Sequence, residues 1–321
     1  MIPIFILSLP RAGSTLLQRK LSEHSEISTT DEPWILLPLL MSRQEHSVTG
    51  IHDQTVLVRA LQDFTDQLPG GQADWDDAVR LFAETLYAKS TPAQERYFLD
   101  KTPRYSLVSA DLLRTFPDAR FVILWRDPIA VVASVNQTWG NGKWAVHRQE
   151  VDLFAGLKGL CDAAIMLGDR AFVLRYEQLL AAPAQTLTNL FEWLDLDPTA
   201  LREECECRVL NGQMGDPKRH GDSGEIRSTG NGDWRQKPLN PLRRRWLRRY
   251  LDWIGAERMV LMGYDLSVWK VDLAATPTTF HHLLGDLVRM AFAPVYRTID
   301  YPVLRKKLRN TWRGQRNFVH K

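Results

Sequence analysis

Short apolar runs alternate along the chain with segments whose apolar residues recur at helical spacing. The runs at 2–9, 97–99, 120–125 and 172–174 predict buried strands. The predicted helices are 14–24, 53–68, 74–90, 106–116, 128–139, 151–167, 183–194 and 241–254. Strands that alternate with crossover helices are typical of an α/β fold with a central parallel sheet flanked by helices. Residues 212–240 lack such a period and are rich in Gly, Asp, Ser and Arg, so we expect a long loop there.

The composition excludes several classes of protein. With 44% hydrophobic and 25% charged residues in 321, the chain has the globular average, which excludes disordered and collagen-like proteins. Three cysteines are too few and odd in number for a disulfide scaffold, and they predict a cytoplasmic protein. The apolar start, 2–9, lacks the positive charge and cleavage site of a signal peptide. A net charge of +3 is too small to indicate nucleic-acid binding.

The C-terminal segment carries most of the positive charge. From residue 276 onward there are nine Lys and Arg and two Asp, a net +7, so the rest of this +3 chain carries −4. Apolar residues alternate with the basic ones, and Pro294 and Pro302 are expected to divide the segment into short helices. Three interpretations stay open: a solvated surface helix, an interface that forms a homo-oligomer, and peripheral contact with a membrane or an anionic substrate.

The first strand runs into a turn that is suited to binding an anion. Its sequence is Pro10-Arg11-Ala12-Gly13-Ser14-Thr15-Leu16. Backbone N–H groups and the dipole at the start of the following helix attract phosphate. Gly13 permits close approach, while Arg11 and the two hydroxyl residues can donate to phosphate oxygens. On this turn alone, an ordinary strand-to-helix connection capped by Ser14 explains the pattern equally well.

A nucleoside triphosphatase loop is the obvious competitor for this turn. It requires Gly, four residues, and then Gly-Lys followed by Ser or Thr. Here Ser8 stands at the first glycine position and Ser14 at the lysine position, so the loop supplies no lysine to the phosphates. A nucleotide-dependent kinase of similar topology is therefore the weaker alternative, and a non-catalytic nucleotide-binding module is a second one.

A second candidate anion site follows the strand 120–125. That strand ends in Arg126-Asp127-Pro128, and Ser134 lies eight residues after the arginine, inside the next helix. An arginine at a strand's carboxyl end and a serine one to two turns into the helix can converge on one phosphate. Together the two motifs resemble those of sulfotransferases that use 3′-phosphoadenylyl sulfate (PAPS). In that family the first turn binds the 5′-phosphosulfate and the second binds the 3′-phosphate.

Further segments resemble the bacterial and tyrosylprotein-sulfotransferase-like branch of this family. They are Thr29-Thr30-Asp31-Glu32-Pro33, 100–105, 174–179, 226–229 and 263–265. The resemblance covers 2–270 and implies a P-loop NTPase-like sulfotransferase fold for a domain 1–270, followed by a basic, partly helical extension 271–321. One departure is Thr138, which stands where an arginine is expected to contact the 3′-phosphate.

The resemblance also implies a role for each matched residue. Glu32 would be the general base toward the acceptor hydroxyl, with Asp31 as its rival. Lys101, Arg11 and Ser228 would complete the catalytic set by stabilising the charge that grows on the leaving phosphate. The implied cofactor-binding residues are Arg11, Ala12, Gly13, Ser14, Thr15, Arg126, Ser134, Tyr176, Ser228 and Thr229.

The implied reaction is in-line transfer of the sulfuryl group from PAPS to an acceptor hydroxyl, which leaves adenosine 3′,5′-bisphosphate (PAP). No metal is expected, and Cys205-x-Cys207 supplies only two sulfurs without a matched histidine pair. The acceptor stays open among a glycan, a lipid-linked sugar, a small metabolite and a tyrosyl peptide. Two structural alternatives also stay open. Lys101 is either a catalytic residue or a turn residue paired with Asp100. Tyr176 and Trp234 either form an adenine slot or pack in the core.

Overall fold

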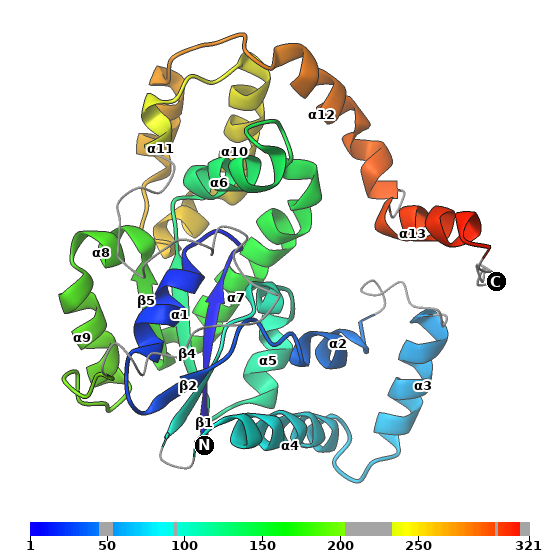
Figure 1. Cartoon of the computed structure of the whole chain (residues 1–321), viewed down its shortest axis with the longest axis vertical. Coiled ribbons are helices and arrows are strands. Elements are labelled where there is room, and N and C mark those ends of the chain that lie inside the picture. The colour runs from blue at the N-terminus through cyan, green and yellow to red at the C-terminus, as the bar shows by residue number, and fades with distance from the viewer. Residues whose placement is uncertain (45–53, 93–94, 203–232, 299–300, 315–321) are drawn as a thin grey trace.

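A parallel sheet forms the centre of the molecule. The computed structural model describes residues 1–44, 54–92, 95–202, 233–298 and 301–314. Within them, five strands pair in the order β2-β3-β1-β4-β5, all parallel (Figure 1). They are β1 Ile2–Ser8, β2 Ile27–Thr29, β3 Tyr97–Asp100, β4 Arg120–Trp125 and β5 Ala171–Arg175. The predicted parallel sheet is confirmed, and β2 is an edge strand that the sequence pattern did not predict.

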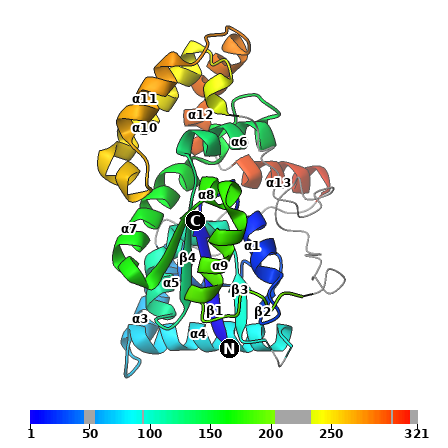
Figure 2. The same cartoon turned by 90° about the vertical axis from the view of Figure 1, so that its left-hand side faces the viewer.

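Helices cover both faces of the sheet. Those of the first half are α1 Ser14–Ser22, α2 Leu36–Met41, α3 Gln54–Asp66, α4 Gln72–Ser90, α5 Ser109–Thr115, α6 Pro128–Gly140 and α7 Leu157–Leu167. The others are α8 Tyr176–Ala181, α9 Pro183–Trp193, α10 Pro241–Leu261, α11 Leu266–Ala275, α12 Leu283–Thr298 and α13 Tyr301–Trp312. Figure 2 shows β4, β1, β3 and β2 side by side in the order of the sheet, with α8 and α9 in front of them.

The side chains of β1 explain the two layers. Successive residues of a strand point to opposite faces, so a strand buried on both faces is apolar throughout. Phe5 and Leu7 belong to the larger core, which includes α4, α5, α7 and α10. Ile4 and Ile6 belong to the smaller core, which includes α1 and α9. A shift of β1 by one residue would exchange the side chains of the two cores, so the pairing of the strands is fixed. The carboxyl ends of β1, β3 and β4 lie at the same end of the sheet.

Some predicted helices differ in detail from those observed. The predicted helix 106–116 is a 3₁₀ turn, η1 Pro103–Val108, followed by α5. The predicted helix 151–167 begins with a π-helical segment, η3 Asp152–Gly156, that runs into α7. Pro294 does not break the C-terminal segment as expected, since α12 continues through it. The predicted domain boundary at residue 270 falls within α11, and the division into two domains stays a prediction.

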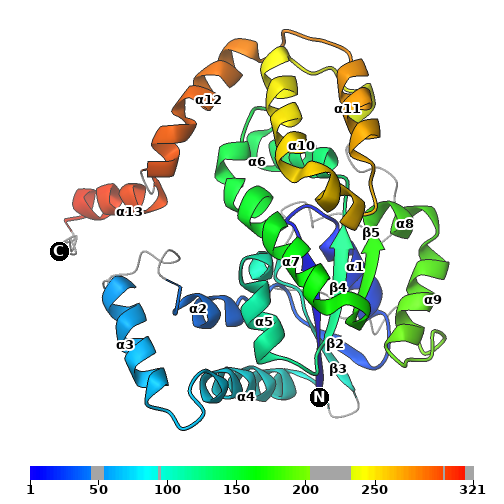
Figure 3. The ribbon, with the colours of Figure 1, turned by 180° about the vertical axis from the view of Figure 1, so that it is seen from behind.

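The last helices form a layer of their own beyond α6 and α7 (Figure 3). α10 bends at Gly255, whose φ of 76° is left-handed, and packs against α11. The start of α12 is attached through Asp286, which accepts hydrogen bonds from Arg243 Nε at 2.6 Å and Asn240 Nδ2 at 2.7 Å. Within the described ranges, no helix is both long and apolar enough to cross a membrane.

Candidate functional site

The turn after β1 presents an uncapped helix start. Gly13 is the N-cap residue of α1, with φ 101°, and among the described residues no side chain caps this helix end. The alternative in which Ser14 caps an ordinary turn is therefore wrong. Arg11 also has a positive φ of 71°, which costs a non-glycine residue energy. Such a turn directs backbone N–H groups of the first helical turn toward the carboxyl edge of the sheet, as an anion-binding turn requires.

The ring of Tyr176 joins the two predicted anion sites. A Cβ atom at Gly13 would overlap Cδ2 of Tyr176, so only glycine allows this packing. The guanidinium carbon of Arg126 lies 4.4 Å from the centre of the same ring. Tyr176 is the first residue of α8, which directly follows β5. The end of β5 therefore supplies an aromatic side chain that contacts the turns after both β1 and β4.

The two predicted anion sites also contact each other directly. Arg126 Nη1 donates to the backbone oxygen of Arg11 at 2.8 Å, and Arg11 Nε donates to Ser134 Oγ at 3.2 Å. β1 and β4 are neighbours in the sheet, with Ser8 opposite Leu124. The sites are thus two sides of one basic region rather than separate features.

Glu32 is held by two donors. Lys101 Nζ lies 2.8 Å from its Oε1, and Trp34 Nε1 lies 3.1 Å from its Oε2. The Lys101 side chain is only 1% exposed and that of Glu32 is 12% exposed. Lys101 Nζ also donates to Thr15 Oγ1 at 3.4 Å. The lysine therefore connects the predicted base to the first turn of α1.

Polar contacts fix the segment that leads to Glu32. Gln18 of α1 donates to Thr29 Oγ1 at 2.9 Å and to the backbone oxygen of Thr30 at 2.6 Å. Thr29 Oγ1 in turn donates to the backbone oxygen of Leu99 at 2.7 Å. The end of β2 is therefore attached to α1 and β3, which determines where the next residues emerge.

Asp100 is not the partner of Lys101. Its carboxylate accepts hydrogen bonds from Tyr87 Oη at 2.6 Å, Tyr105 Oη at 2.9 Å and Thr102 Oγ1 at 3.1 Å. Burial raises the pKa of the Asp100 carboxyl to about 6, and these hydrogen bonds oppose the rise. The ion pair that the structure forms is Lys101–Glu32, so the alternative of a turn lysine paired with Asp100 is wrong.

Comparison of the chain with known proteins shows the family to which it belongs. Residues 3–200 match the model of the sulfotransferase family. The chain belongs to the sulfotransferase family. It is 28% identical over 297 residues to the nodulation protein NoeE of Sinorhizobium fredii, covering 82% of this chain and 66% of that protein. It is 28% identical over 199 residues to protein-tyrosine sulfotransferase 2 of Gallus gallus, covering 60% of this chain and 51% of that protein.

A solved structure supports the same assignment. The sulfotransferase domain of the Synechococcus PCC 7002 olefin synthase is 26% identical, with a TM-score of 0.51, and the match covers 74% of this chain and 88% of that one. The predicted P-loop-like sulfotransferase fold is confirmed. The chain spans between half and two thirds of the length of the two curated relatives. The family match contains every predicted site residue except Ser228 and Thr229, which lie outside the described residues.

The structure contains a second polar network that the sequence did not reveal. Asp127 caps α6, accepting from the backbone N–H of Ile129 at 2.8 Å, and Trp234 Nε1 donates to it at 2.6 Å. Burial raises the pKa of the Asp127 carboxyl. Trp234 is 3% exposed, so it packs in the core instead of forming an open adenine slot. These contacts anchor residues 233–236 beside the 126–128 turn.

Glu177 extends this network to the far end of the fold. Its Oε1 accepts from the backbone N–H of Asp127 at 3.0 Å, and its Oε2 accepts from Tyr264 Oη at 2.8 Å. The neighbouring Arg175 donates to the backbone oxygen of Gly263 at 2.7 Å. The segments 174–179 and 263–265, which resemble the family in sequence, therefore meet in space and support the turn after β4.

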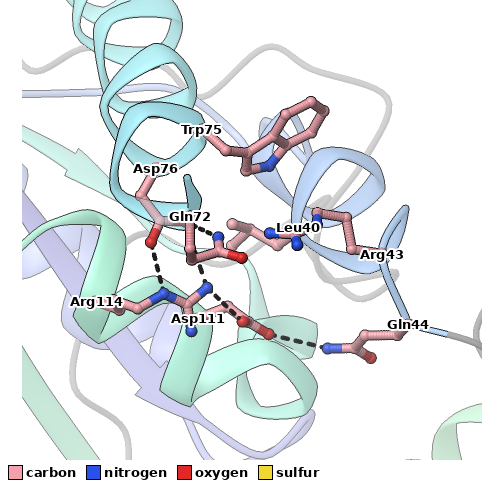
Figure 4. A pocket seen from close by; sticks show the side chains of 8 residues that line it. All are labelled: Leu40, Arg43, Gln44, Gln72, Trp75, Asp76, Asp111 and Arg114. Atoms are coloured by element: carbon pink, nitrogen blue, oxygen red, sulfur yellow. Dashed lines mark hydrogen bonds and ion pairs between the residues drawn. The ribbon is translucent and has the colours of Figure 1, made fainter. Parts of the chain in front are cut away.

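A pocket elsewhere in the molecule is lined by side chains of a different kind. It lies between α2, α4 and α5 and is lined by Leu40, Arg43, Gln44, Gln72, Trp75, Asp76, Asp111 and Arg114 (Figure 4). Arg114 bridges Asp76 at 2.5 Å and Asp111 at 2.8 Å. None of the residues that line this pocket is a predicted site residue, and its charged side chains pair with each other. The candidate site is therefore the basic region at the carboxyl ends of β1 and β4.

Within the described ranges, no three His, Cys, Asp or Glu side chains gather as a metal site requires. Around the predicted site, Arg11, Lys101 and Arg126 supply the positive charge instead. That the reaction needs no metal stays a prediction.

Proposed function

We propose that this sulfotransferase moves the sulfuryl group of PAPS to an acceptor hydroxyl by in-line displacement, with Glu32 as the general base. The observation that carries the proposal is the Lys101 ammonium, which lies 2.8 Å from Glu32 and 3.4 Å from Thr15. The Lys101 ammonium thereby contacts both the Glu32 carboxylate and the anion-binding turn. Transfer of a sulfuryl group from a phosphate to an acceptor hydroxyl needs a base and a cation side by side in this way.

The residues of the two turns fit an adenosine bisphosphate. Arg126 Nε is a buried donor without a hydrogen-bond partner among the described residues, and it lies beside the Arg11–Ser134 pair. This donor set suits the 3′-phosphate. The uncapped start of α1 at Gly13 suits the 5′-phosphate. PAPS would supply a sulfuryl group whose bond to the 5′-phosphate oxygen breaks as the acceptor oxygen binds sulfur.

Glu32 accounts for the proton in this reaction. The hydroxyl proton of the acceptor passes to the Glu32 carboxylate while the oxygen bonds to sulfur. Trp34 and Lys101 each hold one carboxylate oxygen, which fixes the direction of both. Lysine has three N–H donors, and Glu32 and Thr15 occupy two of them. The third can point toward the oxygen on which negative charge grows as the sulfuryl group leaves.

The proposed acceptor is a hydroxyl group of a glycan, a lipid-linked sugar, a small metabolite or a tyrosyl peptide. The relatives named above include a protein-tyrosine sulfotransferase, which supports a hydroxyl acceptor without choosing among these classes. We also propose a cytoplasmic location, supported by the sparse cysteines, of which Cys161 is a buried free thiol.

The test is acceptor screening with labelled PAPS, using Glu32→Gln against the matched control Asp31→Asn. Loss of a general base is expected to lower kcat by about 10²- to 10⁴-fold in Glu32→Gln, with PAP affinity within about threefold of the parent. Asp31→Asn should keep kcat within about threefold. The opposite ranking would make Asp31 the base. PAP binding without turnover on any acceptor would favour a non-catalytic module, and magnesium-dependent ATP binding would favour a kinase.

A further inference from the structure

The outward face of α12 is apolar. Its exposed side chains include Leu284, Leu287, Val288 and Phe292, which are 78%, 51%, 55% and 64% exposed. The spacing of three and four residues places them on one side of the helix. The opposite side carries the buried Asp286. An ordinary surface helix buries its apolar stripe, whereas α12 leaves this stripe exposed and turns Asp286, Met290 and Ala293 toward the body.

Polar anchors hold α12 in this orientation. Asp286 accepts from Arg243 Nε at 2.6 Å, Asn240 Nδ2 at 2.7 Å and the backbone N–H of Trp144 at 3.2 Å. Buried and paired charges are costly to break, so they fix which face of α12 points inward. The apolar stripe is therefore exposed because the opposite side is attached to the body.

α13 continues the pattern and adds positive charge. Leu304, Leu308 and Trp312 are 41%, 62% and 93% exposed and follow each other at intervals of four residues. Each is followed by an exposed arginine, at positions 305, 309 and 313. A basic stripe therefore lies beside an apolar one along the helix, with an aromatic side chain near its end. This combination is typical of helices that lie in a membrane interface.

The charge distribution selects the partner. The segment from residue 276 onward carries nine Lys and Arg against two Asp, whereas the rest of the chain is net negative. A symmetric contact with a second copy would bring two basic stripes together. An anionic lipid surface supplies both the opposite charge and an apolar layer. Figures 1 and 3 show α12 and α13 reaching away from the sheet, where a flat surface could meet them.

We propose that α12 and α13 dock this sulfotransferase on an anionic lipid surface, with the apolar stripes at the acyl boundary and the arginines at the headgroups. The docking is independent of the catalytic assignment, since none of its residues belongs to the candidate site. It would hold the protein at a membrane surface.

Vesicle co-sedimentation of the full chain tests the docking. We expect binding to phosphatidylcholine vesicles with about 30% phosphatidylserine, weak binding to pure phosphatidylcholine, and loss of binding when salt rises from about 0.1 M to about 0.5 M. Arg305→Gln with Arg309→Gln should weaken partitioning about thirtyfold. The matched control, Arg248→Gln with Arg249→Gln, removes the same charge from the exposed side of α10 and should change it less than about twofold.

A second pair of variants tests the apolar stripe. Leu308→Gln with Trp312→Gln should reduce vesicle binding at least tenfold, while Ile165→Gln with Met166→Gln, exposed on α7, should not. All these positions are exposed, and unchanged thermal melting would show that the variants fold. Equal vesicle binding by the arginine pair and its control would overturn the proposal. So would a dimer in sedimentation velocity that the Leu308 and Trp312 changes convert to monomer without any vesicle binding by the parent.

Discussion

The Nζ atom of Lys101 lies 2.8 Å from Oε1 of Glu32, although 69 residues separate them in the chain. β3 delivers the lysine and the segment after β2 delivers the glutamate, and these strands are neighbours at the edge of the sheet. The lysine side chain is 1% exposed. A buried lysine needs a partner, and removing one member of such a pair leaves the other uncompensated.

Lys101→Met is therefore expected to impair catalysis strongly. The variant loses both the fixed position of Glu32 and the cation that we propose beside the leaving phosphate, so kcat should fall about 10²- to 10³-fold. Single-turnover transfer of labelled sulfuryl group measures the effect. Lys89→Met, an exposed lysine at the end of α4, is the control and should leave kcat unchanged.

The combination of Lys101→Met with Glu32→Gln separates a shared role from two independent ones. Residues that act as a unit give losses that do not multiply. We expect the double variant to be no more than about tenfold slower than the worse single variant. Losses that multiply fully would mean that the ion pair has no part in catalysis.

Trp34→Phe tests the second donor to Glu32. The phenyl ring keeps most of the apolar contact but removes the N–H that donates to Oε2. We propose that Trp34 positions Glu32, and we expect kcat to fall about three- to tenfold while KM for PAPS stays within twofold. Steady-state kinetics measure both quantities. Trp193→Phe, at the end of α9, is the control, and an equal loss there would argue against a specific role for Trp34.

The long elements of the fold were predictable because their patterns are strong. β1 and β4 are continuous apolar runs since both faces of each strand are buried. β2 consists of Ile27, Ser28 and Thr29 alone, and its pairing with β3 depends on residues 70 positions away. α2 is six residues long and carries a proline. Elements this short have no periodicity to detect, and tertiary contacts decide them.

Part of the candidate site was predictable from the sequence as well. Gly13 and Arg126 follow neighbouring parallel strands, so their meeting follows from the topology. The hydrogen bond from Trp34 Nε1 to Glu32 was not predictable. The backbone of Trp34 is left-handed, with φ 58°, and no pattern in the sequence indicates this conformation. The contact of Glu177 with Tyr264 spans 87 residues and leaves no local signal.

Gly13→Ala is expected to weaken PAP binding by at least tenfold. The added Cβ would overlap the Tyr176 ring, and alanine at φ 101° is strained. Both effects move the turn and the ring that contacts Arg126. Calorimetric titration with PAP measures the loss. Gly285→Ala is the matched control, because a Cβ there meets open space within α12 and should stabilise the protein by about 0.5–1 kcal/mol.

Asp100 should give the protein a distinctive dependence of stability on pH. Burial raises the pKa of its carboxyl to about 6 in the folded protein, above the value of about 4 expected when unfolded. The folded state therefore binds this proton more tightly, and ionising Asp100 lowers the free energy of unfolding as pH rises from about 4 to 6. Two pH units correspond to a loss of about 3 kcal/mol at most.

Asp100→Asn isolates this contribution from those of other carboxyl groups. The asparagine oxygen can still accept from Tyr87 and Tyr105, but the side chain has no charge to desolvate. The stability of the variant relative to the parent should therefore improve between pH 4 and pH 7, by up to about 3 kcal/mol. Urea unfolding at several pH values measures both proteins. If the free energies of unfolding of the two proteins changed equally with pH across this range, Asp100 would ionise as readily in the folded protein as in the unfolded chain.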